Sequence, residues 1–227
     1  MKTYQELLEG IQDPNIFKAF FLAGGPGSGK SYVVRKTTGG SGLRVVNSDD
    51  AFELLLKKAN LSLKMPAEED EPRGVQFKRA KELTTKRQDN YVVGRIGLII
   101  DGTGKDYDMI TRQATGLKQL GYDVHMIFVN TSLATALERN ANRPRSVPDS
   151  MAVTAWKQVQ SNIGKFSQYF RQNFLIVDNN DADEDVMTPV YKQIQSLLKK
   201  PVRSPLAKQW VTQEMKRRGI TKRPKGW

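Results

Sequence analysis

The stretch FFLAGGPGSGKSYVV, at residues 20–34, constrains the fold of this chain more than any other feature. It begins as an apolar run typical of a buried strand and passes through four glycines. After a lysine and a serine, it continues with residues typical of a helix. A strand that enters a helix through a tight turn is part of a crossover unit, in which parallel strands alternate with helices. We therefore expect an α/β protein.

The rest of the chain continues this alternation. Apolar runs predict four further strands, and amphipathic or capped segments predict the helices between them. Residues 60–74 contain two prolines and an acidic run, so we expect a loop or insertion there. The pattern predicts a five-stranded parallel sheet with helices on both faces. The expected strands are 16–24, 43–50, 95–101, 122–130 and 173–179, and the expected helices are 3–12, 51–59, 75–93, 106–120, 131–143, 150–170, 184–198 and 205–218.

Residues Gly24 to Ser31 match GxxxxGK(S/T), the Walker A pattern. Glycines adopt positive φ angles and let backbone N–H groups approach a phosphate, and the following helix N-terminus adds to this anion site. Lys30 would place its charge near the β- and γ-phosphates of ATP, and the Ser31 hydroxyl would join the shell of a magnesium ion. A glycine-rich turn could match by chance, but the position between strand and helix favours a phosphate site. The predicted ATP-binding residues of this loop are Gly25, Pro26, Gly27, Ser28, Gly29, Lys30 and Ser31.

Acidic residues follow the second and third expected strands. Ligands of parallel sheets sit beyond the carboxyl ends of the strands, where Asp49, Asp50 and Asp101 fall. A kinase needs a carboxylate that accepts or orients the proton of an attacking hydroxyl, and we assign this catalytic role to Asp49. Either Asp49 or Asp50 could instead cap the helix from Ala51, and we expect Asp50 to be the cap. Asp101 is predicted to hold magnesium through water or to orient a basic residue, with a simple strand-end turn as the alternative.

The segment LERNANRPRSVPD, residues 137–149, places three arginines around a helix end. Phosphoryl transfer needs positive charge over the transferring group, and an arginine on a lid can supply it. We predict this catalytic and nucleotide-binding role for Arg143. Arg139 is predicted to bind the nucleotide, and Arg145 is a further candidate. A solvated basic helix end is the alternative for all three.

Composition and missing motifs narrow the function. The chain of 227 residues has no cysteine, which excludes a disulfide framework, a thiolate zinc site and cysteine catalysis. An NKxD motif and an LSGGQ-type signature are both absent, which argues against a GTPase switch and a transporter ATPase. The N-terminal residues lack the apolar core of a signal peptide and no run approaches membrane-spanning length, so we expect a cytoplasmic protein. His125, the only histidine, is expected to be structural, and the Met and aromatic residues of 151–170 are expected to be core.

The positive charge is concentrated at the C-terminus. The net charge is +12, and residues 199–227 hold ten Lys or Arg and one acid, which leaves +3 for residues 1–198. Trp210 and Trp227 lie among these basic residues, a mixture that suits phosphate neutralisation and base stacking. We therefore expect a nucleic-acid partner, with DNA favoured, to bind through this extension. The alternative is a solvated extension whose Trp210 packs on the body of the protein.

Four motifs together resemble a known group of kinases. GGPGSGKS, NSDD, IIDGTG and ERNANRPRSVP occur in the order and approximate spacing seen in the kinase domain of bacteriophage polynucleotide kinase, and they also resemble zeta-toxin-like and phage DNA-base kinases. The resemblance covers residues 17–178. It implies an adenylate-kinase-like P-loop fold with strand order 2-3-1-4-5, ATP and magnesium, and a hydroxyl acceptor. It also implies the roles given above for Lys30, Ser31, Asp49, Asp101 and Arg143. In polynucleotide kinase an arginine that engages the acceptor follows the base aspartate by three residues, where this chain has Phe52.

These observations predict a P-loop kinase domain at 1–198 and a basic extension at 199–227. The expected reaction transfers the γ-phosphate of ATP to a hydroxyl on nucleic acid, either a 5′-hydroxyl end or a hydroxymethylated base in DNA. One alternative is a zeta-toxin-like kinase of a nucleotide or sugar nucleotide. An alternative of another class is a non-catalytic nucleic-acid-binding module with a vestigial P-loop, against which the intact Gly-Lys-Ser and Asp49 argue.

Overall fold

The computed structural model describes residues 10–64, 66–143, 146–181 and 184–221. Five parallel strands form one sheet in the order β2-β3-β1-β4-β5, which confirms the order implied by the resemblance. Parallel pairing requires a crossover after each strand, and helices supply the crossovers. The strands are β1 Lys18–Ala23, β2 Arg44–Val46, β3 Leu98–Asp101, β4 Asp123–Asn130 and β5 Phe174–Asp178.

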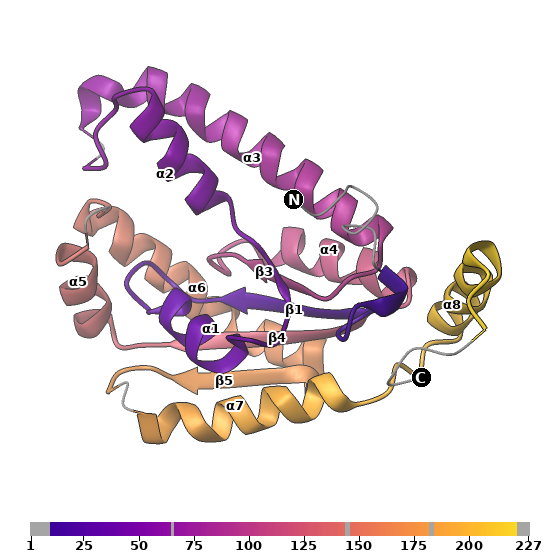
Figure 1. The fold of residues 1–227 in the computed structure, drawn as a ribbon. Coiled ribbons are helices and arrows are strands. Elements are labelled where there is room, and N and C mark those ends of the chain that lie inside the picture. The colour runs from indigo at the N-terminus through magenta and orange to yellow at the C-terminus, as the bar shows by residue number, and fades with distance from the viewer. Residues whose placement is uncertain (1–9, 65, 144–145, 182–183, 222–227) are drawn as a thin grey trace.

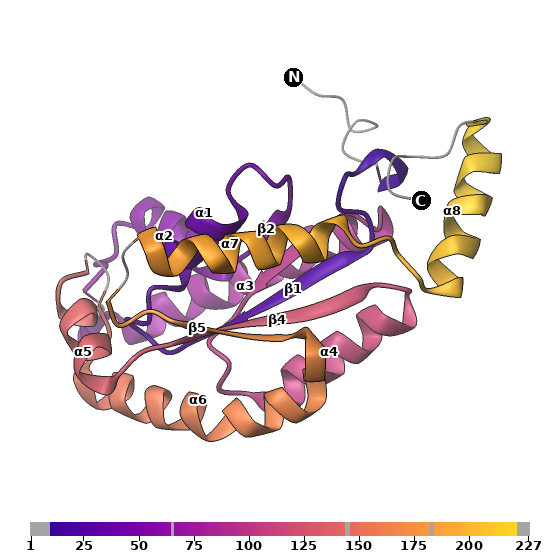
Figure 2. The ribbon, with the colours of Figure 1, turned by 90° about the horizontal axis from the view of Figure 1, so that it is seen from below.

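Helices cover both faces of the sheet, as expected. Figures 1 and 2 show α1 and α7 on one face and α4 and α6 on the other. The α-helices are α1 Lys30–Thr38, α2 Ser48–Lys58, α3 Asp70–Val93, α4 Tyr107–Gln119, α5 Leu133–Ala141, α6 Asp149–Phe170, α7 Glu184–Lys199 and α8 Pro205–Arg218, and the 3-10 helices are η2 Gly10–Gln12, η3 Ala67–Glu69 and η4 Arg171–Asn173.

The central strand β1 is buried along its whole length. Phe20 and Leu22 enter the apolar layer beneath α1 and α7, whereas Phe21 enters the larger layer beneath α4 and α6. A strand buried on both faces reads as a continuous apolar run, which is why KAFFLA shows no alternation of apolar and polar residues. The strand thus holds the glycine loop at its carboxyl end on a rigid support.

Two sequence-based expectations differ from the structure in the N-terminal half. Helix α3 begins at Asp70 and η3 precedes it, so only part of the expected 60–74 loop is non-helical. Pro72 is tolerated because backbone N–H groups in the first helical turn have no intrahelical acceptor, so the N–H that proline lacks costs no hydrogen bond. Asp70 and Glu71 interact favourably with the helix N-terminus. The expected helix at 3–12 falls mostly outside the described residues, and Gly10–Gln12 forms a 3-10 turn.

Helices α2 and α3, with their connection, form a projection that we call the arm. Phe52, Leu56 and Ala80 build a small apolar cluster within the arm, separate from the two layers on the sheet. In Figure 1 the arm extends past the carboxyl ends of the strands and faces α5 and the start of α6 across the site end of the sheet. The arm and the α5–α6 region therefore flank the place where a ligand of this fold would sit.

The basic helix α8 occupies the expected residues and packs at the end of the sheet where the strands begin (Figures 1 and 2). The ring of Trp210 meets the ring of Phe17 edge-on at 5.5 Å between centroids, and the Arg95 guanidinium lies 5.7 Å from the Trp210 ring. Val211, on the same helix, is buried. The structure thus shows Trp210 packed on the body, which was the alternative expectation, while Trp227 lies outside the described residues.

In the part of the chain that the structure describes, no helix combines the length and apolar character needed to cross a membrane.

Candidate active site

The glycine loop joins β1 to α1 and is pressed against neighbouring elements. Gly27 and Gly29 have φ angles of +77° and +80°, which favour glycine. A Cβ on Gly27 would lie 1.9 Å from the carbonyl oxygen of Ala136, and one on Gly29 would lie 2.2 Å from Nδ2 of Asn179. Helix α1 begins directly at Lys30 without a side-chain cap. The loop therefore presents an uncapped helix N-terminus, which is an anion site.

Polar groups inside the loop leave capacity for a ligand. Lys30 Nζ donates to the carbonyl of Gly24 at 2.8 Å, so its ammonium lies over the loop. The Ser28 hydroxyl is buried and has no hydrogen-bond partner among the described residues. Asn179 Nδ2 donates to the Ser28 carbonyl at 2.7 Å and anchors the loop to the segment after β5. A buried hydroxyl without a partner, in a loop that leads into an uncapped helix N-terminus, suits the binding of a phosphate.

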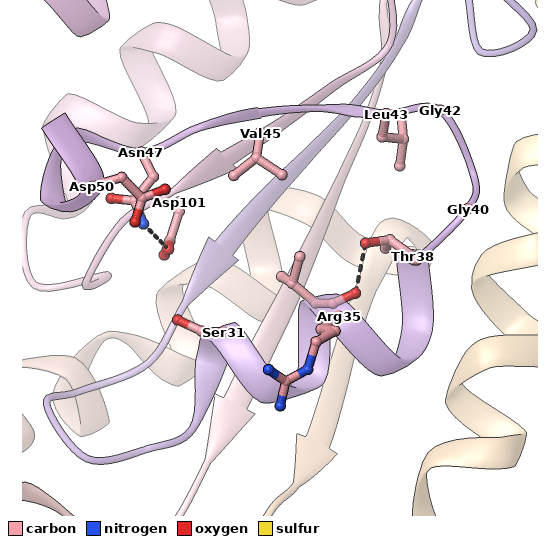
Figure 3. A pocket seen from close by; sticks show the side chains of 12 residues that line it. Ser31, Arg35, Thr38, Gly40, Gly42, Leu43, Val45, Asn47, Asp50 and Asp101 are labelled. Atoms are coloured by element: carbon pink, nitrogen blue, oxygen red, sulfur yellow. Dashed lines mark hydrogen bonds between the residues drawn. The ribbon is translucent and has the colours of Figure 1, made fainter. Parts of the chain in front are cut away.

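Asn47 organises the acidic side of the site, and the sequence analysis did not identify it. Its Oδ1 accepts from the backbone N–H of Asp49 at 2.7 Å, so it is the N-cap of α2. Its Nδ2 donates to Oδ2 of Asp101 at 3.0 Å, which joins the ends of β2 and β3 (Figure 3). The expectation that Asp50 caps the helix is wrong, because α2 starts at Ser48 and asparagine takes the cap. Asp50 instead lines the pocket beside Asp101.

Asp101 is the electrostatic centre of the site. Burial raises its pKa most, and the charges of Asp49 and Asp50 raise it further, whereas Lys30 and Arg143 lower it; the net pKa lies above its ordinary value. These interactions show that the structure brings the four predicted catalytic residues, Lys30, Asp49, Asp101 and Arg143, into one neighbourhood. A partly buried carboxylate beside two others favours a cation as a partner.

A magnesium ion fits the residues present. Ser31 and Asp101 line one pocket of about 380 Å³, which continues along α1 and β2 past Arg35 and Val45 (Figure 3). Magnesium is usually held by one or two carboxylates, water and substrate phosphates rather than by a protein cage. The described residues contain no group of three or more His, Cys, Asp or Glu side chains placed to hold a metal ion by themselves.

The predicted lid arginines take different positions. Arg139 donates to the carbonyls of Asn179 and Asn180 at 2.6 and 2.9 Å, so it ties α5 to the segment after β5 beside the glycine loop. Arg143 is exposed after α5, and its carbonyl accepts from Nζ of Lys64 in the arm at 3.4 Å. Its charge lies close enough to Asp101 to lower the pKa of that carboxyl, whereas the Arg139 guanidinium is engaged by backbone carbonyls. Arg145 lies outside the described residues.

Trp156 is another residue whose place the sequence did not reveal. It was expected in the core, yet it lies beside Gly25 of the glycine loop. Its indole Nε1 donates to the carbonyl of Thr131 at 2.9 Å. The adjacent helical positions Ala152 and Val159 are buried as expected, so helical spacing alone could not distinguish Trp156 from them. Trp156 fixes α6 against the base of the loop.

Comparisons with known proteins agree with this geometry. The sequence model of the family described as Zeta toxin matches residues 6–188. A comparison with curated protein sequences found no significant match. Among solved structures, a gluconokinase from Sinorhizobium meliloti 1021 is 13% identical with a TM-score of 0.50, over 82% of this chain and 95% of that chain. A structure from the PezAT chromosomal toxin–antitoxin system of Streptococcus pneumoniae is 18% identical with a TM-score of 0.52, over 86% and 90%. AvrRxo1-ORF1:-ORF2 with ATP is 15% identical with a TM-score of 0.55, over 77% of this chain and 61% of that chain.

Proposed function

Because the chain belongs to the zeta toxin family, we propose that it is an ATP-dependent kinase that transfers the γ-phosphate to a hydroxyl group. The observation that carries this proposal is the convergence of Lys30, Asp49 and Asp101 at the carboxyl ends of β1 to β3, with the charge of Arg143 acting on Asp101 from the segment after α5. A similar fold has been solved with ATP, which supports the same nucleotide here.

Each residue of the site has a role in this proposal. The glycine loop and Lys30 would hold the phosphates, and Ser31 and Asp101 would hold a magnesium ion that offsets phosphate charge. Asp49 would take the proton of the acceptor hydroxyl as its oxygen bonds to the γ-phosphorus. The bond from that phosphorus to the bridging oxygen breaks, and ADP leaves. Arg143 would stabilise the charge on the transferring group.

We further propose that the acceptor is a hydroxyl of nucleic acid, a 5′ end or a hydroxymethylated base in DNA. The net charge of +12 supports this choice, because a basic surface attracts a polyanion. Two observations favour a nucleotide or sugar nucleotide instead. Helix α8 packs at the far end of the sheet from the glycine loop, and Phe52 is buried inside the arm rather than directed at an acceptor. A binding module with an inactive P-loop is the remaining alternative, and a cytoplasmic setting is part of the proposal.

Transfer of label from γ-labelled ATP tests the reaction and the acceptor together. The purified full chain would be incubated with magnesium and, separately, with 5′-hydroxyl DNA, hydroxymethylated DNA, RNA and a pool of nucleotides and sugar nucleotides. We expect label in a DNA sample. We also expect the rate of transfer by the Lys30→Ala variant to be several orders of magnitude lower than that of the natural chain. Label only in the small-molecule pool would refute the nucleic-acid acceptor, and transfer to none of the samples would refute the kinase assignment for these acceptor classes. Equal transfer by a folded Lys30→Ala variant would refute the role of the glycine loop.

A further inference from the structure

A second cavity lies at the end of the sheet where the strands begin. It has a volume of about 320 Å³ between the start of β4, η4 and the segment that joins α7 to α8. Strand β4 rises roughly 3.3 Å per residue, so its two ends, Asp123 and Asn130, are roughly 23 Å apart. The cavity is therefore separate from the kinase site. Among its lining residues are Asp123, His125, Gln172, Lys200, Arg203 and Ser204.

One wall of this cavity holds a buried cluster of titratable side chains. Lys18 is 2% exposed, and its Nζ lies 2.8 Å from Oδ2 of Asp123. His125 is also 2% exposed, stacks on Phe20 at 4.9 Å between ring centroids, and has Nε2 3.3 Å from the same oxygen. Within the described residues, neither ring nitrogen of His125 makes a hydrogen bond of good geometry. A buried imidazole without such a bond is unfavourable, and a polar ligand in the cavity would relieve this once the side chains that enclose the ring nitrogens shift.

The negative charge of Asp123 is balanced within this cluster. Burial alone would raise the pKa of Asp123, but contact with His125 and Lys18 lowers it well below its ordinary value. The carboxylate is therefore ionised and balances Lys18. It leaves no negative charge for the cationic residues on the opposite wall.

The opposite wall carries unbalanced positive charge. Lys200 and Arg203 are exposed in the segment between α7 and α8, and neither pairs with an acidic side chain in the described part of the chain. Arg203 offers a planar fork of donors that matches a phosphate, and Lys200 adds a point charge. The Gln172 amide and the Ser204 hydroxyl offer neutral hydrogen-bonding groups on the same cavity.

We propose that this cavity binds a phosphate group at a site distinct from the P-loop. Lys200 and Arg203 hold the anion from the segment before α8, Gln172 contacts it from the body, and His125 lies beside it in the cavity wall. Binding would fasten α8 to the start of the sheet. The phosphate belongs either to a small molecule such as a nucleotide or to the backbone of a polynucleotide, since both present the same group.

His125 gives this proposal a direct reporter. It is the only histidine in the chain, so the imidazole resonances of untagged full-length protein need no assignment. We would follow them by NMR at constant pH during titration with sodium phosphate, against sodium chloride of matched ionic strength. The expected result is a saturable shift with phosphate and no saturable shift with chloride. The absence of a saturable phosphate-specific shift would overturn the proposal.

Two exposed cations provide the matched variants. Arg203→Gln removes the proposed anchor, whereas Lys192→Gln removes the same charge from α7 outside the cavity. We expect the phosphate affinity to fall about tenfold in Arg203→Gln, the loss of one charge-assisted hydrogen bond, and to change less than about twofold in Lys192→Gln. Equal affinities in the two variants would overturn the site. Repeating the titration in the Lys30→Ala background separates this result from phosphate binding at the P-loop.

A third titration identifies the source of the phosphate. A short single-stranded oligonucleotide that shifts the His125 resonances at lower phosphate concentration than inorganic phosphate supports the site and assigns it to a polynucleotide backbone. ADP that does so while the oligonucleotide does not also supports the site and assigns it to a nucleotide. Neither assignment requires the chain to phosphorylate nucleic acid. A negative result in this titration would therefore refute the phosphate site without bearing on the kinase proposal.

Discussion

Asn47 gives the sharpest test of how the site is built, because one side chain makes two separable contacts. It caps α2 through the N–H of Asp49 and donates to Asp101. An N-cap contributes about 1 kcal/mol to stability. A hydrogen bond to a charged carboxylate contributes about 1.5–3 kcal/mol, and we take about 1 kcal/mol because this contact is only partly buried. Asn47→Ala should therefore lower the free energy of unfolding by about 2 kcal/mol.

Thermal and denaturant unfolding measure this loss. For a chain of this size it corresponds to a melting temperature lower by roughly 4–8 °C. Asn47→Ser keeps a capping oxygen but cannot also bond Asp101, so it should recover about half of the loss. Equal stability of Asn47→Ala and the natural chain would show that neither contact contributes. Full recovery in Asn47→Ser would show that the Asp101 contact contributes nothing.

The same variants should separate stability from activity. Loss of a donor to the Asp101 carboxylate raises a pKa that burial has already raised, so its magnesium-binding form appears only at higher pH. The acid limb of the kinase rate should shift to higher pH in both Asn47→Ala and Asn47→Ser. A shift in Asn47→Ala alone would assign the effect to the helix cap instead.

Three further predictions concern the reaction and its acceptor. Asp49→Asn should cut the rate by roughly 10²–10⁴ with ATP binding nearly intact, and Asp50→Asn should cost much less; the reverse order would exchange their roles. Arg143→Ala should lower kcat more than it raises the KM for ATP, and a loss confined to KM would make it a binding residue only. Replacing residues 216–218 by glutamine removes three positive charges and the ion pairs of Glu214 but leaves the buried Ala207 and Val211 in place, and circular dichroism would check that α8 is retained. If α8 binds single strands, the slope of log affinity against log salt should fall by about 0.7 for each phosphate that the variant no longer neutralises. An unchanged slope would remove α8 from the nucleic-acid surface.

Much of the fold could be predicted because its signals are local. Apolar runs that stop at glycine, asparagine or aspartate mark the strands, and the order implied by the four motifs matches the sheet. The helix at 205–218 was also predictable, with Ser204 as its cap and Gly219 after its end. The start of α3 was placed too late because Pro72 suggested a loop. A helix accepts proline only in its first turn, and composition does not show where that turn begins.

The missed site residues depend on long-range contacts instead. Asn47 meets a residue 54 positions away, and Asn179 meets one 151 positions away. Amide side chains that bridge separate loops follow no periodic pattern, so only the folded chain reveals them. The packing of Trp210 on Phe17 is also a long-range contact, and the sequence offered it only as the alternative to a nucleic-acid role. The sequence correctly predicted that the basic residues around Trp210 lie on a helix. It could not predict where that helix lies relative to the P-loop.

The separate apolar cluster of the arm has a consequence for motion. Since Phe52, Leu56 and Ala80 pack on each other and not on the layers of the sheet, the outer parts of α2 and α3 can turn as one body, whereas Tyr91 and Val92 keep the end of α3 against the main core. One hinge for such a rotation is available at Asn47, where β2 gives way to α2, and α3 would have to bend before Tyr91. An outward swing would carry Asp49 away from Lys30 and break the bond from Asn47 to Asp101. Catalytic alignment and arm closure would then be a single event, so that an acceptor gripped by the arm assembles the site that phosphorylates it.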